Sequence, residues 1–82
     1  MQYTQDEASS VTQTYNRVAY ARGLVLRAGD KIIDTKHISA NNVLTSDDLA
    51  VIEEGLNEAV DTLQAAREEL GRIRAALVQR GV

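Results

Sequence analysis

Leucine recurs every seven residues through the C-terminal half of the chain. This row consists of Leu49, Leu56, Leu63, Leu70 and Leu77. A second row with the same spacing stands three residues further along and consists of Ile52, Ala59, Ala66 and Ile73. Two apolar rows with this period form one continuous stripe along an α-helix. The pattern predicts a helix over about 46–80, roughly 50 Å long at 1.5 Å per residue.

The centre of the second row is alanine, at Ala59 and Ala66. Alanine lets another backbone approach closely, which favours antiparallel packing over a parallel zipper with branched residues at these positions. We therefore expect the leucine row and the row that contains Ala59 and Ala66 to form one continuous strip that is buried against neighbouring helices. Val51 and Val60 widen the apolar face, as is typical of a helix in a bundle.

The N-terminal half predicts a second helix, over about 5–34. Its apolar residues step by three or four along one stripe that consists of Val11, Tyr15, Val18, Ala21, Val25, Ala28 and Ile32. Gly29 is an alternative end for this helix. A second alternative makes residues 31–39 a short strand or hairpin. Residues 35–45, with Asn41 and Asn42, are the predicted loop.

Both predicted helices begin with a capping-box spacing. Thr4 precedes Glu7 and Thr45 precedes Asp48 by three residues, with Ser46 as an alternative cap of the second helix. Each helix also begins acidic and becomes basic toward its end, which complements its macrodipole. When the chain folds back on itself, each acidic start lies near the other basic end. The charge order therefore predicts antiparallel pairing.

The predicted fold is all-α, with residues 1–82 forming a single helical-hairpin domain. Several apolar residues, including Tyr20, Leu24 and Leu26, lie off the main stripe of the first helix and need cover. The chain has 82 residues, no cysteine and one histidine, so disulfides and a multi-histidine zinc site within one chain cannot stabilise it. We expect self-association into a four-helix bundle or a higher oligomer, although a larger protein partner would cover the same residues.

Charge and hydropathy give no general attraction to nucleic acid or membrane. The net charge is −3, and no apolar run approaches the ~20 residues that cross a bilayer. The first ten residues lack the basic-then-apolar order of a signal peptide. From these features we expect a cytoplasmic location and no membrane partner.

Catalytic chemistry has little support in the sequence. His37, near Asp34 and Ser39, is expected to be a solvated loop residue. The acidic residues of the second helix lack the Glu-x-x-His spacing of a bundle metal site, so we interpret them as a solvated face: Glu53, Glu54, Glu58 and Asp61. The scattered glycines match no phosphate-binding loop. We expect no catalytic residue, no metal and no cofactor.

The preferred functional hypothesis is a small non-enzymatic interaction protein that acts as a regulator, inhibitor or assembly adaptor, a class that includes bacterial and viral accessory proteins. Its predicted self-association seam comprises both apolar rows of the second helix. The alternative is a binder of nucleotide or nucleic acid that uses arginines and tyrosines at subunit junctions. The candidate anion or partner contacts are Tyr20, Arg22, Arg67 and Arg74.

Overall fold

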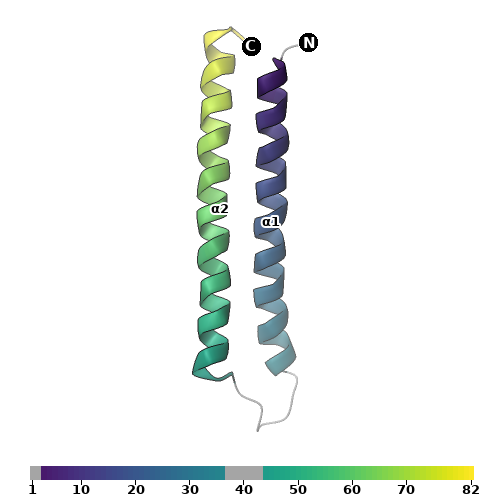
Figure 1. The fold of residues 1–82 in the computed structure, drawn as a ribbon, viewed down its shortest axis with the longest axis vertical. Helices are drawn as coiled ribbons and strands as arrows, with labels where there is room; N and C mark the ends of the chain where they lie inside the picture. Colours follow the sequence, from purple (N-terminus) through teal and green to yellow (C-terminus); the bar gives the residue numbers. More distant parts are fainter. Residues whose placement is uncertain (1–2, 37–43) are drawn as a thin grey trace.

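The computed structural model is an antiparallel helical hairpin (Figure 1). It describes residues 3–36 and 44–82, and for 33–36 it describes the backbone alone. Helix α1 spans Gln5–Lys36 and α2 spans Ser46–Gln79. The all-α hairpin predicted from the sequence is confirmed. Because α1 continues through Gly29 to Lys36, the alternatives of an earlier helix end and of a strand beginning at residue 31 are wrong. Residues 37–43 of the predicted loop, which include His37, Ser39, Asn41 and Asn42, lie outside the described residues.

Both helices start at the predicted capping boxes. The Thr45 hydroxyl accepts a hydrogen bond from the Asp48 N–H, and the Asp48 carboxylate accepts one from the Thr45 N–H, each at 3.1 Å. Thr4 and Glu7 make the same reciprocal pair at 2.9 and 3.1 Å. These bonds satisfy N–H groups that the first turn of a helix leaves without a backbone partner. Thr45, rather than Ser46, is therefore the N-cap of α2.

The helices meet along a seam of small side chains, which we call the hairpin seam. Ala21, Ala59 and Ala66 are only 1–2 % exposed. Thr14 is also buried, and its hydroxyl donates to the Ser10 carbonyl at 2.9 Å, so the burial leaves no unsatisfied polar group. The other buried residues in the part of the chain whose burial is described are Leu24, Ala28, Ile52 and Ile73. The seam therefore brings the two backbones close and buries few large side chains.

The leucine row does not lie in this seam. Four of its leucines are 40–51 % exposed, and only Leu77 is half-buried. The prediction of one strip containing both rows is therefore wrong for the hairpin itself, since α2 turns only the row from Ile52 to Ile73 toward α1. The physical reason is steric at the central layers of α2, because Ala59 already packs against Ala21 and Leu24 of α1 and leaves little room for a leucine of α2 at that position.

The predicted stripe of α1 is divided in the same way. Ala21 and Ala28 are buried, whereas the larger residues of the stripe stay exposed: Tyr15, Val18, Val25 and Ile32. Leu24, which lies off the predicted stripe, is buried in the seam instead. The seam thus consists mainly of small residues together with Leu24, Ile52 and Ile73, and each helix leaves a row of larger apolar residues outside it.

Ion pairs at both ends of the hairpin confirm the orientation that the charge order predicts. Lys31 lies 3.5 Å from Asp48, and Arg80 pairs with Glu7. The Arg80 hydrogen bond, helped by the Thr4 cap, holds the pKa of Glu7 below its ordinary value. Hydrogen bonds from Thr45 and the nearby Lys31 lower the pKa of Asp48. Cap and ion pair therefore act on the same two carboxylates.

Replacing Ala66 with leucine should destabilise the hairpin, because the added side chain would separate two closely packed backbones. We expect a loss of about 1–3 kcal/mol, the usual cost of overpacking, measured by urea unfolding at a fixed protein concentration. Ala50 is exposed on the same helix, so Ala50→Leu is the matched control and should leave stability nearly unchanged. Equal stability of the two variants would show that the helices are not close at this layer.

Acidification should destabilise the hairpin through Glu7 and Asp48. A carboxyl group with a lowered native pKa contributes stability above its unfolded pKa and loses it as the pH falls through the native pKa. Unfolding temperatures followed by circular dichroism should fall below about pH 4.5, where Glu7 begins to take up protons in the unfolded chain. Glu7→Gln should make this fall shallower. A variant as acid-sensitive as the parent chain would count against the role of the Glu7 contacts.

Candidate interaction surface

One side of the hairpin carries an apolar row from each helix. Every residue of the α2 leucine row directly follows a residue that faces α1, and the apolar row of α1 likewise follows residues that face α2. In two antiparallel right-handed helices, one residue step from the contact line turns both rows to the same side. We call this surface the leucine face, and it consists of Val11, Val18, Val25 and Ile32 from α1 with Leu49, Leu56, Leu63, Leu70 and Leu77 from α2.

The register of the hairpin aligns these two rows level by level. Lys31 contacts Asp48, and the residues that follow them are Ile32 and Leu49. Contacts between the helices closer to the chain termini keep the same register. The further level pairs are therefore Val25 with Leu56, Val18 with Leu63, and Val11 with Leu70.

The leucine face is exposed over most of its length. Apart from half-buried Val11 and Leu77, its residues are 40–51 % exposed. Single exposed leucines are common, but a continuous apolar strip on a small protein marks an interaction surface. At the end of this strip a shallow hollow of about 500 Å³ is lined by Tyr3, Leu70, Ile73, Arg74, Leu77, Val78 and Val82.

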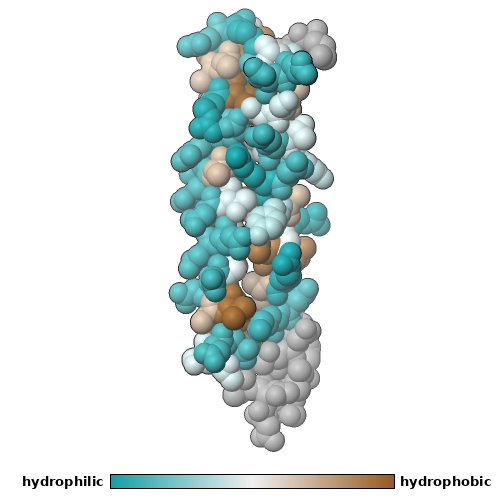
Figure 2. All heavy atoms as spheres, in the orientation of Figure 1, coloured by the Kyte–Doolittle hydropathy of each residue, from teal (hydrophilic) through white to brown (hydrophobic). Residues whose placement is uncertain are grey.

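The opposite side of the hairpin, which we call the polar face, carries a hydrogen bond between the helices. The Tyr20 hydroxyl donates to the Glu58 carboxylate, which raises the pKa of the tyrosine. With α1 on the right in Figure 1 and running downward, the right-handed helices turn this face toward the viewer. Figure 2 accordingly shows a mainly hydrophilic surface with small apolar patches. The two sides of the hairpin therefore differ strongly in polarity.

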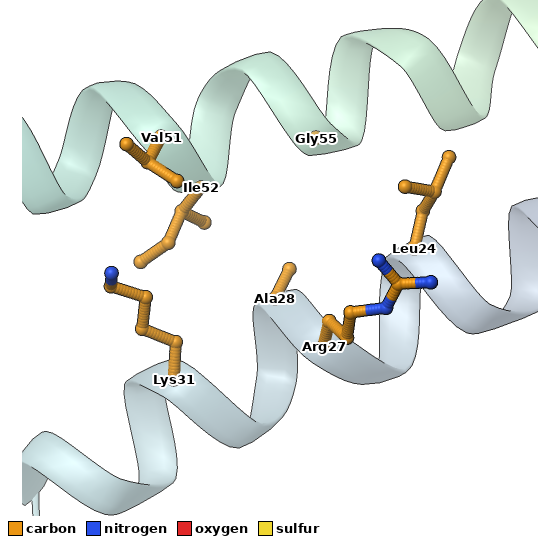
Figure 3. Close-up of a pocket in the computed structure, with 7 residues that line it drawn as sticks. All are labelled: Leu24, Arg27, Ala28, Lys31, Val51, Ile52 and Gly55. Carbon is orange, nitrogen blue, oxygen red and sulfur yellow. The ribbon is translucent and has the colours of Figure 1, made fainter.

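A half-open pocket of about 210 Å³ lies between the helices on the polar face (Figure 3). Gly55 contributes no side chain to its wall, while Arg27 and Lys31 extend from α1 toward α2 on either side of Ala28. The other lining residues are Leu24, Val51 and Ile52. The pairing of Arg27 with Lys31 was not predicted from the sequence. Their spacing of four puts them on one face of a helix. The pocket itself cannot be predicted from this spacing, because it also depends on Gly55 of α2 lying beside this part of α1.

The structure does not bring the four predicted anion contacts together in one chain. Tyr20 lies on the polar face with Glu58. Arg22 lines a shallow hollow with Tyr15, and Arg74 lines the hollow at the end of the leucine face. Arg67 is exposed and, like Arg74, stands four residues after a leucine of that face. Three of the four residues therefore border the leucine face, and the fourth does not.

The predicted acidic face shows no cation site among the residues that the structure describes. Over 3–36 and 44–82, no group of three or more carboxylate, histidine or cysteine side chains is placed to hold a metal ion. One nearby carboxylate with a lowered pKa is Glu69, which accepts hydrogen bonds from Arg72 and Ser10. Because Ser10 belongs to α1, the Glu69 carboxylate links α2 to α1 and stabilises the contact between the two helices.

Neither described helix has the length and apolar character that crossing a membrane requires. No family model, curated protein or solved structure matches the chain. The geometry of the leucine face, the polar face and its pocket therefore carries the functional argument.

Proposed function

We propose that this chain is a small non-enzymatic interaction protein. It self-associates through the leucine face, and the resulting helical bundle binds another macromolecule as a regulator, inhibitor or assembly adaptor. The observation that supports this proposal is the continuous apolar strip that the hairpin leaves exposed along both helices.

The energetics of a hairpin this small favour cover for that strip. The hairpin seam buries Leu24, Ile52 and Ile73 but otherwise mainly alanine. Full burial of one leucine or valine contributes about 1.5–3 kcal/mol, and a whole domain is stable by only about 5–15 kcal/mol. The leucine-face residues are already about half covered in the hairpin, so covering each of them completely contributes roughly half of the value for full burial. Covering several of them therefore adds several kcal/mol, a large share of the stability of a small domain.

The polar face supplies the surface for the other macromolecule. In a bundle closed by the leucine faces, it stays on the outside of each hairpin. It carries the exposed ring of Tyr20 and the pocket beside Arg27. Tyrosine and arginine are enriched where proteins contact one another. Self-association and partner binding thus use opposite sides of the same hairpin.

The second candidate function is nucleotide or nucleic-acid binding, and the pocket between Arg27 and Lys31 is the observation that favours it. A phosphate group at the mouth of this pocket would lie between two cations. Asp48, however, already contacts Lys31. Binding through phosphates would weaken steeply as salt is added, so a salt titration with a nucleoside triphosphate as the probe distinguishes this function from apolar docking.

Leu63→Asp should strongly weaken self-association and leave the hairpin helical. Leu63 is 43 % exposed at the centre of the leucine face, so an aspartate there is tolerated in the single chain and opposed only by association. We expect a dissociation constant at least about tenfold weaker, because apolar contact is lost and a charge must be desolvated. Light scattering gives the solution mass, and circular dichroism gives the helicity.

Leu26→Asp is the matched control for this experiment. Leu26 is 54 % exposed on α1 but lies off the leucine face, so the variant should keep the mass of the parent chain. Loss of self-association in both variants would indicate a general effect of charge. A parent chain that is monomeric at every concentration tested would refute self-association through the leucine face.

A further inference from the structure

We infer that the leucine face is covered by a second copy of this chain turned end for end. In this arrangement α2 packs antiparallel on α2 of the second copy, with Leu63 at the twofold axis. The inference rests on the proposed function, since it specifies the geometry of the self-association. It is supported by the charges that border the leucine face.

The leucine row is symmetric about its central member. Rotating one copy end for end about Leu63 brings every leucine of α2 opposite a leucine of the second copy. The resulting pairs are Leu49 with Leu77, Leu56 with Leu70, and Leu63 with itself. Antiparallel helices with leucine at every such layer bury a continuous apolar strip.

The border of the row carries opposite charges at its two ends. Glu53 and Arg74 each stand four residues after a leucine, and both are exposed. Glu53 lies ten residues before Leu63 and Arg74 lies eleven residues after it. The same rotation therefore places Glu53 of one copy beside Arg74 of the other, and symmetry repeats the pair at the far end.

The α1 half of the face obeys the same symmetry. Val18 is level with Leu63, so it also lies near the axis. Tyr15 and Arg22 stand on either side of Val18 and line a common shallow hollow. End-for-end packing puts the Arg22 guanidinium of one copy beside the Tyr15 ring of the other, a favourable cation–π arrangement. Val11 then packs against Val25 of the second copy.

A twofold axis parallel to the helices is the competing arrangement. It places α2 on α1 of the second copy, level with level. Glu53 would then lie level with Ala28, and Arg74 level with Glu7. The Glu7 carboxylate already pairs with Arg80 and accepts the Thr4 cap bond within the hairpin, so neither charge gains a new partner in this arrangement. End-for-end packing pairs both charges, and opposite charges across an interface fix its orientation.

The hollow at the end of the leucine face also suits the end-for-end arrangement. It lies between Leu70, Arg74 and Leu77, where that arrangement brings Leu49 of the second copy. The apolar floor of the hollow would receive the Leu49 side chain of the second copy. Arg74 at the edge of the hollow would meet Glu53 of that second copy. Shape and charge thus favour the same occupant of this hollow.

Cross-linking through introduced cysteines tests the register directly, because the chain has no cysteine of its own. With a short bismaleimide, Leu63→Cys should yield covalent dimers. A mixture of Leu49→Cys and Leu77→Cys should also cross-link, whereas Leu49→Cys alone should not, because its two copies lie at opposite ends of the bundle. Leu26→Cys is the control for random collision and should remain uncross-linked.

Charge reversal tests the orientation independently. Glu53→Arg should weaken dimerisation about threefold to tenfold at low salt, because it replaces an ion pair by a repulsive pair at each end. Adding Arg74→Glu to that variant should restore the parent affinity. Glu54→Arg changes charge by the same amount at an exposed position next to Glu53 but off the leucine face, and it should show neither effect.

The outcomes separate this inference from the proposed function. A dimer in which Leu63→Cys cross-links to Val18→Cys of another copy, but not to itself, overturns the end-for-end geometry and leaves self-association standing. Failure of the Arg74→Glu change to restore affinity overturns the proposed charge pairing. A chain that stays monomeric overturns both the inference and the self-association on which it rests.

Discussion

The close approach of two helices at alanine is the constraint on which the rest of this structure depends. Ala21, Ala59 and Ala66 are almost fully buried, and with side chains this small the backbones approach closely. That approach determines which side of α2 faces α1, because a leucine at these layers would hold the helices apart. Apart from Leu24, Ile52 and Ile73, the larger apolar residues that the structure describes lie outside this contact, and those on one side of it form the leucine face.

In this hairpin, the contacts that fix how the two helices pair differ from the surface that can bury most apolar area. Caps, end-to-end ion pairs and the small seam fix the orientation and register of the two helices, but they bury little apolar area. Nine large aliphatic side chains lie on the leucine face, where only another molecule can cover them. In the proposed bundle, association would add to the stability of the hairpin, so the unfolding temperature would rise with protein concentration.

Local sequence features predicted both helices, both capping boxes and the antiparallel charge order, because each depends on residues a few positions apart. The contacts of α2 with α1 could not be obtained in this way. Two rows of α2 flank the row that contains Ala59 and could complete the contact with α1. One is the leucine row and the other contains Gly55 and Thr62, and hydrophobicity alone predicts the leucine row. The row of α2 that contacts α1 depends on α1 itself, because its small buried residues Thr14 and Ala21 allow a close approach only where α2 also has small residues. The pocket beside Arg27 likewise depends on this register.

The order of charges along α2 acts at more than one level of organisation. Its acidic start complements the helix macrodipole and places Asp48 beside Lys31 within the hairpin. In the proposed dimer the same order, through Glu53 and Arg74, selects the end-for-end orientation. That orientation would leave two identical polar faces on opposite sides of the bundle, each with an exposed Tyr20 ring. A macromolecular partner would then meet two equivalent sites related by a twofold axis, which favours either a symmetric partner or the joining of two separate ones.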